Sequence, residues 1–136
     1  MKVKKKEKSC GCIVIENNKV LLIQHIKRGH WGFPKGHVEK NENEMQTAIR
    51  EVKEETNIDV EIDENKRYEE HYNTGKKGYK EVVYFLAKKV GGEIKAQEKE
   101  IRNVEWVDIS EAPNRITFPT SQELMKKVIN DEKLLK

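Results

Sequence analysis

The sequence predicts an α/β fold in which helices cover a mixed β-sheet, and three features support this prediction. Two β-branched, apolar segments near the beginning of the chain are typical of a strand hairpin. A later segment carries apolar residues at helical spacing. Residues 82–86 are almost continuously apolar, which is typical of a strand covered on both faces. Hairpins, helices and a central apolar strand together indicate a layered α/β domain.

Size and charge narrow the class of protein. The chain has 136 residues, with 27 Lys and Arg against 24 Asp and Glu and a net charge of +3. This length favours one domain over residues 1–136. Nearly balanced charges with patterned apolar residues favour a globular domain over a disordered one, and the small positive excess gives no argument for nucleic-acid binding.

The expected cellular compartment depends on whether the sequence contains a membrane-spanning or a secretory segment. The longest apolar stretches have about four residues, too few for a helix that spans a bilayer. No apolar region follows the basic residues 2–8, so we expect no secretory signal. Cys10 and Cys12 would point to the same face of a strand and should not bond to each other. We therefore predict reduced, partly buried thiols in a cytoplasmic protein.

The elements can be predicted in chain order. Strands at residues 10–16 and 19–26 form a hairpin through Asn17 and Asn18, because asparagine tolerates the positive φ of a tight turn. The glycine- and proline-containing residues 27–41 predict a loop. The remaining expected elements are strands at 58–62 and 67–73, a turn at 75–78, a strand at 79–90, a turn at 91–92, a strand at 104–107 and a helix at 120–130.

Residues 44–56 carry the clearest helical pattern. Asn43 is a good N-cap, and Gln46 three residues later completes a capping box. The apolar residues recur at helical spacing and form one stripe: Met45, Ala48, Ile49 and Val52.

Three glutamates of this helix, Glu51, Glu54 and Glu55, lie beside the apolar stripe. Like charges at this spacing cost a helix a few tenths of a kcal/mol each. A hard divalent cation removes that repulsion, and clustered oxygen ligands suit Mg²⁺ or Mn²⁺. Because Mg²⁺ shares its ligand shell with substrate phosphates, the cluster predicts phosphate chemistry. A solvated helix face is the alternative that these glutamates alone leave open.

The spacing around the glutamates resembles a family motif. Gly36, five residues, Glu42, seven residues and then residues 50–58 resemble the Nudix box, G-x5-E-x7-R-E-U-x-E-E-x-G-U, in which U is aliphatic. One position departs, because Asn57 stands where the family has glycine. Asparagine is the next best residue for a left-handed helix cap, so we expect a small loss of stability and no loss of activity. The resemblance implies a Nudix-type α/β/α sandwich with a central mixed sheet, and hydrolysis of a nucleoside diphosphate linked to another group.

The resemblance also implies a role for each matching residue. Arg50 and Glu42 match positions that hold the box together by ion pairing, and Arg50 is the i,i+4 partner of Glu54. We count Arg50 among the candidate catalytic residues, with a structural role as the first interpretation. The implied ligands of Mg²⁺, or of Mn²⁺ as the alternative, are Glu51, Glu54, Glu55 and the carbonyl of Gly36.

Hydrolysis needs an acceptor for the proton of the attacking water. Glu54 is one candidate, and Glu98 and Glu100 in a separate loop are others, of which we prefer Glu100. A solvated charge run is the alternative for the loop glutamates. Lys35 would place a fixed positive charge against a phosphate, unless it is an ordinary loop lysine.

Further stretches resemble diadenosine tetraphosphate hydrolases: residues 31–39 (W-x-x-P-K-G-H-x-E), 83–87, 98–101 and 104–107. The first hypothesis is therefore metal-dependent, asymmetric cleavage of diadenosine tetraphosphate into ATP and AMP. The second is a pyrophosphohydrolase of nucleoside triphosphates, including oxidised ones, or of the RNA 5′ end. The third is a nucleotide-binding regulator without turnover.

The same resemblance predicts substrate contacts. Tyr84 matches an aromatic residue that stacks on adenine, although it could simply be core. Phe118 or Tyr79 could supply another stacking face. His37 fits the family pattern, and His30 could touch a phosphate. The expected partner is thus a small nucleotide, with no membrane, no nucleic acid, and a monomer or homodimer.

Overall fold

The structure, a computed structural model, describes residues 5–73 and 78–135. The turn predicted at residues 75–78 therefore falls mainly outside the described chain, as do the first residues of the basic N-terminus. The elements, in chain order, are β1 (Lys5–Glu16), β2 (Lys19–His25), β3 (Trp31–Gly32), β4 (Lys35–His37), α1 (Glu44–Thr56), β5 (Asp59–Asn73), β6 (Gly78–Gly91), β7 (Ile101–Asp108), α2 (Ala112–Arg115) and α3 (Pro119–Asp131).

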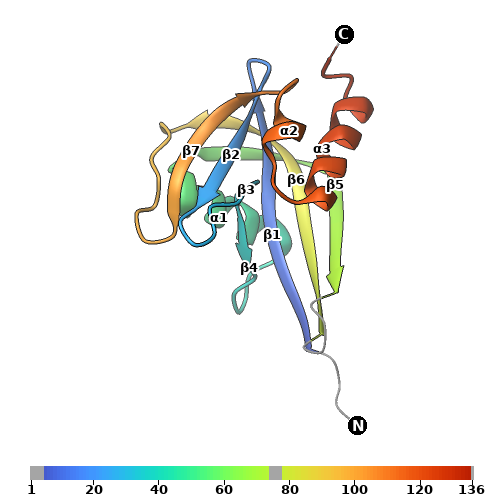
Figure 1. Ribbon diagram of the computed structural model, residues 1–136. Coiled ribbons are helices and arrows are strands. Elements are labelled where there is room, and N and C mark those ends of the chain that lie inside the picture. Colours follow the sequence, from blue (N-terminus) through green and yellow to red (C-terminus); the bar gives the residue numbers. More distant parts are fainter. Residues whose placement is uncertain (1–4, 74–77, 136) are drawn as a thin grey trace.

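Seven strands of the described chain form the mixed sheet that the sequence predicts. Five of them follow the order β3-β2-β1-β6-β5, while β4 pairs with β1 and β7 pairs with β2. The long strands β1 and β6 run parallel and side by side, and the other pairs are antiparallel (Figure 1). The prediction of a central mixed sheet is confirmed.

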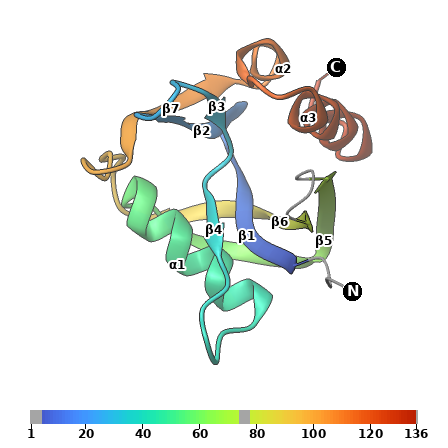
Figure 2. The ribbon, with the colours of Figure 1, turned by 60° about the horizontal axis from the view of Figure 1, so that its bottom comes forward.

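Helices cover both faces of the sheet, with α1 on one side and α2 and α3 on the other (Figure 2). Alternate residues of β6 enter the two cores. Val82 and Tyr84 pack on the side of α3, whereas Val83 and Phe85 pack on the side of α1. The strand is therefore covered on both faces, as its continuous apolar run predicts.

The structure confirms the turn and the helix caps that the local sequence predicts. Asn17 and Asn18 adopt positive φ of 50° and 66° in the β1–β2 turn. Helix α1 has the predicted bounds, and Asn43 and Gln46 form the capping box. Asn57 ends the helix in the left-handed region with φ of 68°, and its N–H donates to the Lys53 carbonyl. Asparagine thus supplies the conformation that glycine has in the family motif.

Other expectations were wrong in detail. The loop predicted at residues 27–41 contains β3 and β4, whose few residues form strands because β2 and β1 offer them paired edges. The strands predicted at 58–62 and 67–73 form the single strand β5, with a register shift between Asp63 and Arg67. The short helix α2 was not predicted. None of these features has a periodic pattern long enough to detect.

The two cysteines lie on one face of β1, as expected, but Cys10 and Cys12 are fully buried against α1 rather than partly buried. Burial raises the pKa of the Cys10 thiol to about 11 and raises the pKa of Cys12 further. Within the described chain, no helix has the length and apolar character needed to cross a membrane.

Candidate active site

Gly36 of β4 lies directly against the carboxylate of Glu51. A Cβ on Gly36 would be 1.6 Å from Glu51 Oε2, so no other residue fits here without displacing that carboxylate. β4 itself approaches β1 at Gly11, where a Cβ would be 2.1 Å from the Pro34 carbonyl oxygen. Two glycines therefore allow the loop before α1 to reach the glutamates of the helix.

Glu55 and Glu51 are enclosed between α1 and β4. Glu55 is 7% exposed and accepts a hydrogen bond of 2.9 Å from the backbone N–H of Lys35. Burial, followed by the charge of Glu51, raises the pKa of Glu55 to about 8. Burial and the neighbouring Glu54 raise the pKa of Glu51 to about 7, against the opposing effect of Arg50. Glu100 contributes to both shifts, so this loop carboxylate lies within electrostatic reach of the pair.

Arg50 joins the loop to the helix. Its Nε and one terminal nitrogen donate to the two carboxylate oxygens of Glu42 at 2.6 and 3.0 Å. The guanidinium also donates to Glu54 Oε1 at 3.1 Å and to the carbonyl oxygen of His37 at 3.1 Å. Its hydrogen bonds are the main cause that lowers the pKa of Glu42 to about 2. Glu54 is half-exposed and engaged with Arg50, unlike the enclosed pair Glu51 and Glu55.

This donor set fits a hard divalent cation. Its candidate ligands are all oxygen atoms, the type that Mg²⁺ and Mn²⁺ prefer. Burial and then repulsion between carboxylates raise the pKa values of Glu51 and Glu55, so added positive charge would favour their ionised forms. A divalent cation would supply that charge.

A cavity of about 310 Å³ opens next to the glutamates. Four residues that the sequence analysis singled out line it: Lys35, Tyr84, His30 and Phe118. Lys35 connects the cavity to the glutamates, because its backbone N–H donates to Glu55 and the residue also lines the cavity. A larger cavity of about 600 Å³ is lined by residues such as Ile15, Leu86 and Leu134 and includes no residue of the glutamate cluster.

Aromatic rings form one wall of the cavity. His25 and His30 stack with ring centroids 4.2 Å apart, and Phe118 lies 5.0 Å from His30. Tyr84 is 1% exposed and packs edge-on against Phe33, yet it also lines the cavity. Tyr84 is therefore a core residue that also forms part of the cavity wall, and its stacking on a base stays a prediction. The Nδ1 atom of His30 is buried without a hydrogen-bond partner in the described chain.

The positive charge of the cavity comes from lysines. Burial and the adjacent His30 lower the pKa of His25 to about 4, and burial and Lys35 lower the pKa of His30, so both rings are neutral at pH 7. Burial and the nearby Lys80 lower the pKa of Lys35 to about 8. Lys35 and Lys80 thus provide the donors that an anionic substrate needs at neutral pH.

Sequence reasoning missed part of this cavity. The sequence predicts no role for four residues that line it: His25, Tyr72, Lys80 and Ser121. The period of two along β6 could have found Lys80, because it shares a face with Tyr84. Tyr72 lies opposite Lys80 in the β5–β6 ladder, and that register is not readable from the sequence.

Two predicted substrate residues lie elsewhere. The side chain of His37 is exposed, and its Nε2 lies 3.9 Å from Glu7 Oε2. Its carbonyl oxygen accepts a hydrogen bond from Arg50. Tyr79 lies near His71, with ring centroids 6.3 Å apart, on the sheet face opposite Tyr84. Neither residue lines the cavity.

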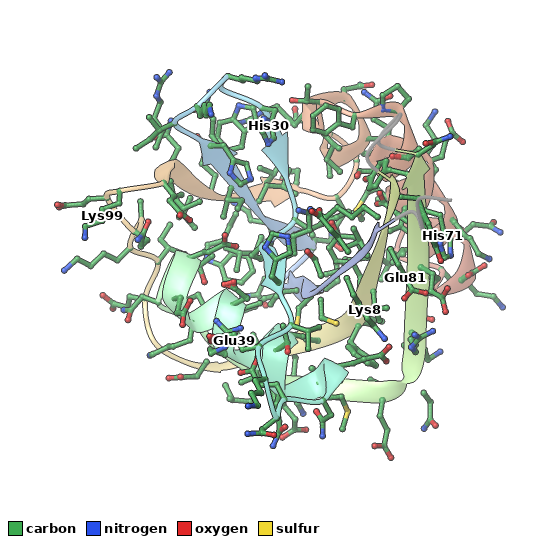
Figure 3. All side chains as sticks on the ribbon, turned by 90° about the horizontal axis from the view of Figure 1, so that it is seen from below. Lys8, His30, Glu39, His71, Glu81 and Lys99 are labelled. Carbon is green, nitrogen blue, oxygen red and sulfur yellow. The ribbon has the colours of Figure 1, made fainter. Side chains whose placement is uncertain are left out.

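A separate group of metal-ligand types lies on β5 and β6. Side-chain atoms of Glu69, His71 and Glu81 lie within 4.8 Å of one another. Figure 3 places His71 and Glu81 together, apart from His30 of the cavity. Arg67 already pairs with Glu69, and Lys8 lies 3.9 Å from Glu81, so nearby cations already offset the charge of these carboxylates.

The comparisons with known proteins agree with this geometry. Residues 5–128 match the model of the NUDIX domain. The chain is 39% identical over 125 residues to the asymmetrical bis(5′-nucleosyl)-tetraphosphatase of Rattus norvegicus, covering 77% of this chain and 81% of that protein. It is 34% identical over 102 residues to the m7GpppN-mRNA hydrolase of Saccharomyces cerevisiae, covering 72% of this chain and 10% of that protein.

Among solved structures, an Ap4A hydrolase of C. elegans in a binary complex superposes with a TM-score of 0.82 and 29% identity, over 95% of this chain and 99% of that chain. The chain spans only about half the length of two further curated relatives, 52% and 44%.

Proposed function

This chain belongs to the Nudix family, and we propose that it hydrolyses diadenosine tetraphosphate asymmetrically into ATP and AMP. One observation carries the proposal. Lys35 donates its backbone N–H to Glu55 and also lines the cavity that contains Tyr84 and Phe118. A nucleotide whose base occupies the cavity would therefore direct its phosphates past Lys35 towards the glutamates. Relatives that act on bis(5′-nucleosyl) tetraphosphates support the choice of substrate.

Glu51, Glu54, Glu55 and the carbonyl of Gly36 would hold Mg²⁺, with Mn²⁺ as the alternative. When bound, such a cation neutralises phosphate charge and lowers the pKa of a bound water. The protein's own part is to fix these oxygens in place. Gly36 admits the Glu51 carboxylate, and the Lys35 N–H orients Glu55.

We propose Glu100 as the group that accepts the proton of the attacking water. It is exposed, it lies in the loop before β7, and its charge reaches Glu51 and Glu55. Glu54 is the alternative, but its carboxylate accepts hydrogen bonds of 3.1 and 3.2 Å from Arg50. Its two oxygens are therefore already engaged as acceptors of the Arg50 guanidinium. Arg50 is thus proposed to hold Glu54 and Glu42 in position.

Within the cavity, Tyr84, Phe118 and His30 are proposed to contact the base. Lys35 and Lys80 are proposed to bind phosphate oxygens, because their ammonium groups supply donors only. His37 remains a candidate through its place beside Glu7 at the edge of β4, where an extended substrate could pass.

A second candidate keeps the same site and changes the substrate to a nucleoside triphosphate or an RNA 5′ end. Similarity to an m7GpppN-mRNA hydrolase favours it. A regulator without turnover is a weaker candidate, because all three box glutamates are present. A cytoplasmic location and a monomer or homodimer complete the proposal.

Product analysis tests these candidates. The purified protein with Mg²⁺ is incubated with diadenosine tetraphosphate, with nucleoside triphosphates and with a 5′-triphosphate RNA, and chromatography identifies the products. We expect ATP and AMP from the first substrate, faster than any other turnover. Faster release of pyrophosphate from a triphosphate or RNA would favour the second candidate. No turnover of any substrate by folded, metal-binding protein would favour the regulator.

A further inference from the structure

A buried carboxylate lies behind the wall of the cavity. Glu70 of β5 is 5% exposed. Ser121 Oγ donates to its two oxygens at 2.9 and 3.1 Å, and Thr120 Oγ1 donates at 3.3 Å. The hydroxyl of Tyr72 also donates to Glu70. Three hydroxyl groups from two elements therefore converge on one carboxylate that does not itself line the cavity.

Glu70 faces the first turn of α3, which is a favourable place for a carboxylate. Thr120 and Ser121 belong to the first turn of α3, and Phe118, the N-cap residue, makes no capping hydrogen bond with its side chain. A carboxylate at a helix N-terminus is stabilised by the partial positive charge there. Through the hydroxyl groups of Thr120 and Ser121, Glu70 thus joins the first turn of α3 to β5.

The hydrogen bonds of Glu70 determine what the cavity can offer a ligand. A hydroxyl group has one hydrogen and two lone pairs, and an ionised carboxylate only accepts. Tyr72 and Ser121 line the cavity, and the hydroxyl group of each donates its hydrogen to Glu70. Their oxygens can therefore only accept hydrogen bonds from a bound molecule.

We propose that Glu70 sets the base preference of the cavity, by making Tyr72 and Ser121 acceptors that select a base with an exocyclic amino group over one with a carbonyl group. At C6, adenine presents an amino donor that meets this requirement, whereas hypoxanthine presents a carbonyl oxygen that does not. The inference rests on the proposed function in so far as the cavity receives a nucleobase. Lys35 and Lys80, the donors of the cavity, remain for the phosphates.

A matched pair of nucleotides tests the proposal. AMP has an amino group at C6, whereas IMP has a carbonyl group there and a proton on the neighbouring ring nitrogen. Calorimetry measures the affinity of each nucleotide at constant Mg²⁺. A single mismatched hydrogen bond in a buried site costs about tenfold in affinity, so we expect wild type to prefer AMP by that factor. Glu70→Gln introduces an amide donor towards the hydroxyls. One of them can then turn its hydrogen to the cavity, and the preference should fall to about twofold or less.

The control is Glu69→Gln, because Glu69 is exposed and points to the opposite face of β5. It should keep the wild-type ratio. Tyr72→Phe provides a second variant should Glu70→Gln unfold, and it should weaken AMP binding without changing IMP binding. A ratio, unlike a single affinity, is insensitive to a general loosening of α3.

Equal binding of AMP and IMP to wild type, a preference for IMP, or an unchanged ratio in folded Glu70→Gln would overturn the proposal, as would failure of both nucleotides to bind. Failure of the proposed function has a different signature. Wild type would then discriminate between AMP and IMP as expected, yet hydrolyse none of the polyphosphate substrates.

Discussion

The backbone N–H of Lys35 donates a 2.9 Å hydrogen bond to Glu55 Oε1, and this contact joins the two parts of the site. Glu55 belongs to the carboxylate cluster on α1, whereas Lys35 lines the aromatic cavity under α3. The bond fixes the distance between the candidate metal site and the candidate base site. Changes at this junction should therefore affect catalysis more than stability.

Gly36→Ala should abolish most activity while the fold persists. The new methyl group would overlap the Glu51 carboxylate, 1.6 Å from the Cβ position, and that flexible side chain would move away. Because misplacing a reacting group by about 1 Å can cost about 100-fold, we expect at least that loss in kcat. Gly91→Ala at the end of β6 is the matched control, since it lies outside the cavity and its Cβ would first meet the exposed Asp59 side chain, at 3.2 Å from Oδ2. Equal activity of the two variants would contradict the proposed role of Glu51.

Glu100→Gln should lower kcat by about 100-fold or more, because general-base catalysis typically contributes that much. KM should change little, since the side chain is proposed to act on the water rather than on the nucleotide. Glu98→Gln in the same exposed loop is the control. If Glu98→Gln had the larger effect, the assignment of the base would be wrong.

Arg50→Lys should destabilise the protein by about 1–3 kcal/mol, because one ammonium cannot replace the paired hydrogen bonds to Glu42 and the bond to the His37 carbonyl. Urea unfolding measures the change. Activity should fall as well, since the loop before α1 loses its attachment. The exposed Arg102→Lys should lie within about 0.5 kcal/mol of wild type. A similar result for Arg50→Lys would exclude the proposed attachment.

Asn57→Gly should leave activity unchanged and stability nearly so. Glycine is more easily accommodated at φ of 68°, a gain of up to about 1 kcal/mol. However, Asn57 Nδ2 donates to the Glu93 carbonyl at 3.0 Å, and glycine loses that bond, worth about 1 kcal/mol. The two effects should nearly cancel in urea unfolding. A tenfold rise in turnover would show that the departure from the family motif limits activity.

His25 should make the protein less stable in acid. Its pKa is lowered to about 4 by burial and by His30, from an ordinary value of about 6.5 in an unfolded chain. The unfolded state therefore binds more protons between these values. The free energy of unfolding should fall as the pH drops from about 6.5 to 4 and stay lowered below that. His25→Gln should flatten this dependence in urea unfolding at several pH values, and an unchanged slope would refute the assignment.

Much of the carboxylate cluster could be predicted because its signals are local. The apolar period, the Asn43–Gln46 capping box and the left-handed Asn57 lie within one segment, so short-range sterics and hydrogen bonds determine α1. The glutamates then share a side of that helix by geometry alone. Gly36, which lies against Glu51, belongs to the segment directly before this helix, so the whole cluster comes from one stretch of the chain.

The sequence by itself therefore determined the helix, its carboxylates and the α/β class, and the tertiary structure decided the cavity. Tyr72 lines it opposite Lys80 because of the β5–β6 register, and Ser121 reaches Glu70 from α3. Registers and helix docking depend on packing between segments far apart in the chain, and no short-range signal encodes which side chains they bring together. The same physics explains why His37 matches the family pattern and yet its side chain does not line the cavity.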